Sequence, residues 1–213
     1  MKKFYFLLVL VLLSSTAVFS QGATVGKLVR HDAKNLSFGF KAGLNMANLT
    51  NDDTLTTKVA FTAGAFGMLK LNPTTSITLE LLYSQQGCAA KDVRYQGQNV
   101  EGFSLNYLNI PILFNSYPIP GLALKAGIQP GFLLSSSLDL SLEQIKTSIN
   151  AKEVFKSFDF SVPIGASYEL DMGLLFDFRF NIGVTNILKD IPDDPDNSTS
   201  NNFVIQFTVG YRF

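Results

Sequence analysis

The sequence predicts an all-β fold, namely an eight-stranded antiparallel transmembrane β-barrel of the up-and-down type with both termini in the periplasm. Three observations lead to this prediction. Segments of roughly ten residues alternate apolar and polar side chains, as strands do when one face meets lipid and the other a lumen. The connections between these segments are alternately long and short. The chain also begins with a segment that has the features of an export signal.

The N-terminus predicts a secreted chain. Lys2 and Lys3 precede the apolar run "FYFLLVLVLL", which gives way to "SSTAVFS". A basic start, a short apolar run and small residues before a cleavage point are typical of a secretory signal peptide. We expect residues 1–20 to be this peptide, 21–35 a periplasmic segment and 36–213 the barrel domain. An uncleaved anchor is the alternative, but the run breaks before the roughly 20 residues that a spanning helix needs.

Composition excludes several classes of protein. The 17 basic and 17 acidic residues balance, so no basic surplus favours a nucleic-acid partner. Cys88 is the only cysteine, so no disulfide can form within the chain. Beyond the signal, no apolar run is long enough for a membrane helix. A membrane location therefore requires strands, because only helices and closed barrels satisfy all backbone groups in lipid.

The alternation is clearest in "NNFVIQFTVGYRF", where every second residue from Phe203 to Phe213 is apolar. In a soluble sandwich this face would form the core, whereas in a membrane barrel it would face lipid. Only the segment 59–70 does not show which of its faces is polar. The eight predicted strands are 36–45, 59–70, 76–85, 107–114, 122–132, 158–170, 173–183 and 201–213.

The connections give a second test of the fold. Those at 46–58, 87–101, 135–153 and 184–202 are long, and those at 71–75, 115–121 and 170–173 are short. Outer-membrane barrels have short periplasmic turns and longer extracellular loops, which a soluble sandwich has no reason to copy. The third long connection contains "LSLEQIKTSI", whose apolar spacing also permits a short amphipathic helix.

Four segments carry a resemblance to a known family. "KAGLNMANL", "YLNIPILF", "NIGVTNI" and the terminal "GYRF" resemble signatures of the small outer-membrane β-barrels common in Bacteroidetes, labelled PorT-like or porin-family. The resemblance implies an eight-stranded barrel in outer-membrane lipid without established catalytic residues. It implies that Tyr211 and Phe213 form an assembly signal for the barrel-assembly machinery. PorT-like members are also linked to a gliding and protein-secretion apparatus.

Three prolines depart from an ideal barrel, because Pro111, Pro130 and Pro163 lie inside predicted strands and cannot donate to a ladder. We expect bulges or strand ends to absorb them, with Pro111 near the inner rim and Pro130 near the outer rim. Since the chain has no Trp, Tyr168 and Tyr211 are expected at the periplasmic interface.

Residues typical of catalysis or metal binding are sparse. His31 is the sole histidine and precedes the first strand, and Cys88 is expected in the second long loop. The acidic stretch "DDPDNSTSNN", with Asp193, Asp194 and Asp196, could collect a divalent cation, but its spacing matches no defined calcium loop. We therefore predict no enzyme activity and no catalytic, cofactor-binding or metal site.

Charged residues on the inward face of the strands predict how the interior of the barrel is organised, because buried charges persist only when they are paired or hydrated. Eight strands enclose an interior that side chains can fill. We therefore expect a lumen charge network that plugs the barrel, in a protein whose role is structural or interaction-based through its extracellular loops. A small-solute porin is the alternative, and an accessory of a secretion or gliding apparatus is a lesser one. The network is expected to comprise Lys41, Glu80, Lys125, Asp177, Arg179 and Arg212.

Overall fold

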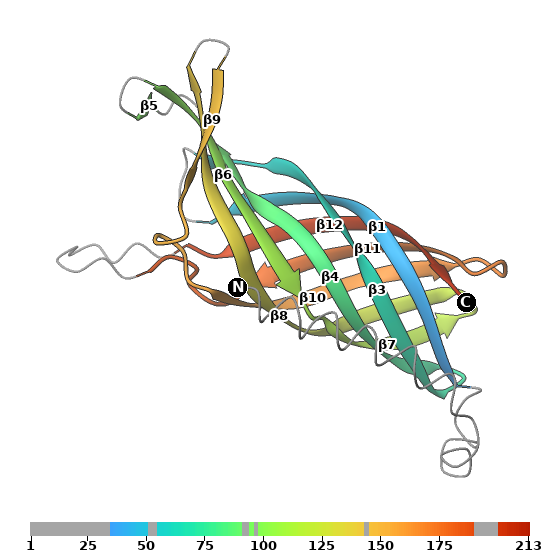
Figure 1. Ribbon diagram of the computed structural model, residues 1–213. Helices are drawn as coiled ribbons and strands as arrows, with labels where there is room; N and C mark the ends of the chain where they lie inside the picture. Colours follow the sequence, from blue (N-terminus) through green and yellow to red (C-terminus); the bar gives the residue numbers. More distant parts are fainter. Residues whose placement is uncertain (1–34, 51–54, 91–93, 96–97, 143–144, 190–199) are drawn as a thin grey trace, which may run out of the picture. The chain divides into compact units, whose positions relative to one another are not determined.

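The computed structural model describes residues 35–213 except 51–54, 91–93, 96–97, 143–144 and 190–199 (Figure 1). Residues 37–213 form a single folded unit. Among the described residues, none forms a helix with the length and apolar character that a membrane crossing needs. The strands in this part of the chain are β1 (Leu36–Leu49), β2 (Leu55–Thr56), β3 (Lys58–Asn72), β4 (Thr75–Ala90), β5 (Arg94–Tyr95), β6 (Gln98–Asn109), β7 (Ile112–Ile119), β8 (Leu122–Leu142), β9 (Ile145–Asn150), β10 (Phe158–Glu169), β11 (Leu174–Gly183) and β12 (Asn202–Arg212).

Eight strands of this sheet close into a ring. The ring runs β1, β3, β4, β6 with β7, β8, β10, β11 and β12. β6 and β7 act as one barrel strand, because the register against β4 is the same on both sides of the break, with Leu82 opposite Asn109 and Leu79 opposite Ile112. β12 pairs with β1 in antiparallel fashion and closes the ring. The predicted eight-stranded antiparallel barrel is therefore confirmed.

The connections alternate in length around the ring, as predicted. The three short turns join β3 to β4, β7 to β8 and β10 to β11. They lie at one end, because backbone hydrogen bonds join Tyr117 to Thr74 and Glu169 to Gly121. The end of β12 is at the same end, where the Arg212 amide donates to the Gly173 carbonyl over 2.9 Å. The four long connections leave the opposite end.

The alternation of side chains also holds. Phe207 is 48% exposed, whereas its neighbours Gln206 and Thr208 are 2% and 1% exposed inside the barrel. The sequence did not show which face of the segment 59–70 points inward. In the structure, Phe66 and Met68 point inward and are buried. The outer surface of the barrel is thus apolar, and its interior is mainly polar with some large apolar side chains.

Several strands continue past their predicted ends on the long-connection side. β4 reaches Ala90, so Cys88 lies in a strand and is fully buried, and its expected place in a loop was wrong. β8 reaches Leu142 and pairs with β9, with Leu142 opposite Ile145, so the segment that permitted a helix is a β-hairpin. In Figure 1, β5, β6 and β9 project beyond the ring.

The outer face of β8 changes character along its length. It is apolar as far as Leu134, which is exposed, and then presents Ser135. A register shift against β6 marks this point, because Asn106 pairs with Ser135 while Tyr107 pairs with Leu133. Beyond the shift, the residues with the same parity as Ser135 are polar, namely Ser137, Asp139 and Ser141. We call this part of the sheet, formed by residues 84–90, 98–106 and 135–150, the projection.

Pro111 lies in the break between β6 and β7, and Pro130 lies on the neighbouring strand β8. The Pro111 carbonyl accepts the Glu80 amide over 2.9 Å, which places Pro111 within the wall, so its expected position near the inner rim was wrong. Pro130 lies opposite Phe160, close to the long-connection end of β10, and its carbonyl accepts the Ile110 amide over 2.9 Å. A proline loses only its donor, so these carbonyls keep the register. At Pro111 the expected strand end is present, because β6 ends at Asn109 and β7 begins at Ile112, and no bulge forms there.

Pro163 is held in the same way. It lies opposite Asn181 in the ladder with β11. On its other side, the ladder with β8 omits Val162 and Pro163 and resumes in the same register at Ile164, which lies opposite Ala126. The proline therefore interrupts pairing on one side without shifting the strand.

Candidate functional site in the barrel lumen

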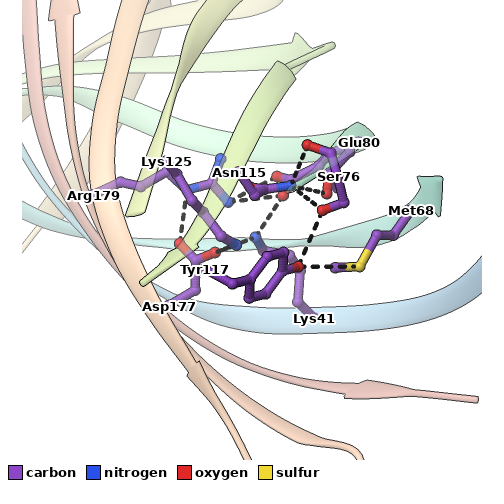
Figure 2. A network of polar contacts seen from close by, with 10 residues as sticks. Lys41, Met68, Ser76, Glu80, Asn115, Tyr117, Lys125, Asp177 and Arg179 are labelled. Carbon is purple, nitrogen blue, oxygen red and sulfur yellow. Dashed lines mark hydrogen bonds and ion pairs between the residues drawn. The ribbon is translucent and has the colours of Figure 1, made fainter. Parts of the chain in front are cut away.

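Five charged side chains meet inside the barrel (Figure 2). They come from four strands and are almost completely buried, with side chains 0–2% exposed. We call them the lumen cluster, and they are Lys41 on β1, Glu80 on β4, Lys125 on β8, and Asp177 and Arg179 on β11. Each faces inward because it has the parity of the polar residues on its strand.

The bonds converge on the two carboxylates. Arg179 Nη2 donates to Glu80 Oε2 over 2.8 Å and to Oε1 over 3.1 Å, while its Nε donates to Asp177 Oδ1 over 2.7 Å. Lys41 Nζ bridges Glu80 Oε1 at 2.9 Å and Asp177 Oδ2 at 3.3 Å. Lys125 Nζ donates to Asp177 Oδ2 over 2.5 Å. Every member thus has at least one charge-assisted hydrogen bond, the stronger class of such bonds.

A glycine gives Arg179 the room to cross the lumen. Gly165 on β10 lies opposite Arg179 on β11. A Cβ at Gly165 would lie 2.7 Å from Arg179 Cγ and 2.1 Å from the Phe178 carbonyl oxygen. A side chain at this position would displace the arginine from Glu80.

A second, uncharged layer lies between the lumen cluster and the short turns. Asn115 Nδ2 donates to Ser76 Oγ over 2.9 Å and to Thr78 Oγ1 over 2.8 Å. The hydroxyls of Ser76 and Tyr117 are 3.0 Å apart, and Tyr117 Oη lies 3.4 Å from Met68 Sδ. Figure 2 shows this layer beside the charged side chains.

Arg212, the sixth expected member, does not join the lumen cluster. Its Nε donates to Glu169 Oε1 over 2.7 Å, and the two side chains are 26% and 15% exposed. They line a cavity of about 510 Å³ at the short-turn end, together with Lys70, Tyr117 and Asp171. Glu169 has inward parity on its strand, but the sequence alone does not show that it is the partner of Arg212.

Apolar packing that the sequence did not predict lies at the long-connection end of the lumen. Phe155 and Ile187 are 1% and 0% exposed and pack with residues of the barrel strands. Phe155 forms an antiparallel bridge with Leu188, and the Lys156 amide donates to the Ile187 carbonyl over 2.7 Å. We call the segments 151–157 and 184–189 the cap. The strand residues beneath it are Leu49, Cys88, Leu105, Tyr107 and Leu133.

A buried carboxylate lies near the cap. Asp159 is 6% exposed and accepts hydrogen bonds from Thr185 Oγ1 at 2.7 Å and from Asn202 Nδ2 at 2.8 Å. Its inward parity was visible in the sequence, but its partners were not, because Thr185 lies in a long connection. Asp159 helps to hold the cap segment 184–189 on the barrel.

Among the described residues, no three His, Cys, Asp or Glu side chains gather in a way that could hold a metal ion. His31 and the acidic stretch with Asp193, Asp194 and Asp196 lie outside the described residues. The lumen cluster has no hydroxyl or thiol nucleophile bonded to a base in the manner of a catalytic triad. Its chemistry is that of ion pairing between buried side chains.

Comparisons with known proteins identify a matching family and similar solved structures. A family model described as "Outer membrane protein beta-barrel domain" matches residues 19–189. The solved structure of Ail, the attachment invasion locus protein of Yersinia pestis, superposes with a TM-score of 0.51 at 9% identity, over 84% of this chain and 99% of that one. For Neisserial surface protein A the TM-score is 0.48 at 11% identity, over 82% and 95%. The comparison with curated proteins gave no match.

Proposed function

From the premise that this chain belongs to the outer membrane protein beta-barrel domain family, and is therefore an integral protein of the outer membrane, we propose a structural or interaction role carried by its long connections, around a lumen that does not conduct. The observation that carries the proposal is the presence of buried, packed side chains at two levels of the lumen. The lumen cluster fills one level with paired side chains, and the cap fills the other with apolar ones.

The proposed orientation follows from the connections. Outer-membrane barrels keep short turns in the periplasm and longer loops outside the cell. We therefore assign the turn end to the periplasm, and the cap and the projection to the cell surface. In this arrangement residues 1–20 act as the cleaved signal peptide and residues 21–35 remain in the periplasm.

The projection offers an ordered surface for a partner. Lys58 Nζ lies 3.1 Å from Asp139 Oδ2, Ser148 Oγ donates to Asp139 Oδ1 over 2.9 Å, and Ser104 also donates to this carboxylate. Partial burial opposes the ionisation of Asp139, but the hydrogen bonds from Ser104 and Lys58 outweigh it, so the pKa of Asp139 lies below its usual value. These bonds join β3, β6, β8 and β9 above the apolar band, which favours recognition by a fixed sheet.

The C-terminus supports the proposed assembly signal of Tyr211 and Phe213. The Phe213 amide donates to the Phe38 carbonyl over 2.9 Å, so the last residue belongs to the seam that closes the barrel. The rings of Tyr211 and Phe213 meet edge to face with centroids 5.4 Å apart, and Tyr211 is exposed on the outer face. Both side chains are therefore available to a barrel-assembly machinery.

Electrical recording tests the proposal. Refolded wild-type protein in planar bilayers is expected to show no steady conductance, because the side chains at both levels must move before ions pass. Heat-denatured protein from the same preparation is the control for detergent artefacts. A stable, ohmic conductance of the folded protein would overturn the proposal and favour a small-solute porin.

A further inference from the structure

The lumen cluster carries unequal numbers of positive and negative groups. Lys41, Lys125 and Arg179 face only two carboxylates, those of Glu80 and Asp177. With all five ionised, the cluster holds one surplus positive charge in an interior where its side chains are at most 2% exposed. An uncompensated charge in such a place is unfavourable.

Other charges along the described lumen do not balance this surplus. Glu169 is bound by Arg212 at the short-turn end, so that pair is neutral by itself. Asp159 lies six positions along β10 from Gly165, the residue opposite Arg179. Six positions of an extended strand span about 20 Å, which leaves Asp159 remote from the lumen cluster.

Three residues of β11 and β12 carry buried hydrogen-bond donors without partners. Arg179 Nη1 is buried and has no acceptor. Thr208 Oγ1, opposite Asp177 on β12, and Gln206 Nε2, opposite Arg179 on the same strand, are also buried without partners. Buried donors normally have partners, so three on two adjacent strands indicate a missing acceptor.

We propose that the lumen cluster holds one small monovalent anion of the halide type, bound by Arg179 Nη1 with Thr208 and Gln206 on β11 and β12. One negative charge neutralises the surplus. A small ion is required because side chains already fill the interior of an eight-stranded barrel. Oδ1 of Asn45 and of Asn181, acceptors without partners on this wall, suit water molecules that accompany the ion.

The inference goes beyond the proposed function, because the ion is a fixed part of the interior and no transport is involved. Its test is the stability of the full mature chain refolded in detergent in sodium gluconate and titrated with sodium chloride at constant ionic strength. The thermal unfolding midpoint of the wild type is expected to rise with chloride and then saturate, as binding to the folded state alone requires. An unchanged midpoint would overturn the proposal.

Lys125→Met is the decisive variant. It leaves two cations and two carboxylates, and Asp177 keeps its bonds from Lys41 and Arg179. The chloride response is expected to disappear in this variant. Arg212→Met, which removes a cation outside the cluster, is the matched control and should respond as the wild type does. A response that persists in Lys125→Met would contradict the proposed site.

Two further measurements remain informative if Lys125→Met does not fold. Thr208→Val keeps the shape of the side chain but removes one proposed donor, so its chloride response should be weaker than that of the wild type. Crystals of wild-type protein refolded in bromide should show an anomalous scattering peak beside Arg179 Nη1. A full response in Thr208→Val together with no bromide peak would refute the site.

Discussion

Removal of an acid from the lumen cluster should destabilise the barrel far more than removal of a base. Glu80 accepts three hydrogen bonds, two from Arg179 and one from Lys41. Glu80→Gln leaves three cations facing one carboxylate, so the surplus rises from one positive charge to two. Breaking a buried ion pair by removing one partner costs about 3–5 kcal/mol, and we expect Glu80→Gln to fall in this range.

Lys125→Met should be the milder change. It removes one hydrogen bond of Asp177, which by itself contributes about 1.5–3 kcal/mol when the groups are charged. Loss of the surplus charge offsets part of this, so the net cost should lie below that range. Asp171→Asn, on an exposed turn, is the control and should leave stability unchanged.

The free energy of unfolding can be measured by urea titration in lipid vesicles. The chain contains no Trp, so far-UV circular dichroism or a gel-mobility assay has to report folding. If Lys125→Met costs as much as Glu80→Gln, or more, then charge balance does not control the stability of the interior and the reasoning fails.

Three further predictions concern the wall, the cap and the orientation. Phe207→Arg on the outer face should lower the free energy of unfolding by about 2–4 kcal/mol if Phe207 lies near the bilayer midplane, whereas Tyr211→Arg, which is equally exposed but near the strand end, should lower it by about 0–1 kcal/mol. Equal costs of the two variants in the urea titration would exclude a lipid-facing strand. Cys88 should not react with maleimide in the folded protein and should react fully in denaturant, and rapid reaction in the native state would show that the cap does not cover it. On intact cells, a cysteine probe at Ser148 in the projection should be labelled and one at Thr74 in a short turn should not, and the reverse pattern would invert the proposed orientation.

The barrel could be predicted from sequence because its main signal is local. A strand between lipid and a lumen has to alternate apolar and polar side chains. About ten residues are therefore enough to recognise the strand and to tell its outward face from its inward face. The alternation of apolar and polar side chains is lost where the outer face of a strand no longer meets lipid. Beyond Tyr83 the outer face of β4 is no longer apolar, so the alternation ends although the strand continues to Ala90. Cys88 was misplaced for this reason.

Parity shows which face a residue occupies but not its depth. Arg212 and Arg179 have the same inward parity, yet only Arg179 reaches Glu80, because β12 ends at the short-turn rim. The stagger between strands sets these depths, and it is decided by pairings between distant parts of the chain. For the same reason, parity alone would predict that Gln206→Arg is harmless, but Gln206 lies opposite Arg179 and the new cation would enlarge the buried surplus.

The cap escaped prediction because its segments have no periodic pattern. Phe155 and Ile187 stand in connections that are otherwise rich in polar residues. An isolated apolar residue in a loop is common, so it carries little information about burial. Only the pairing of the two connections with each other, through Phe155 and Leu188, brings these side chains over the lumen.

The seam between β1 and β12 has a consequence for biogenesis. It joins Gly39 to Arg212, so the ring cannot close until β12 has been synthesised and exported. Until then Lys41 on β1 and the acidic groups of β4 and β11 are not enclosed together, and bare charges facing hydrocarbon are strongly disfavoured. Closure of the ring by β12 is therefore the step that brings these charges together inside the barrel.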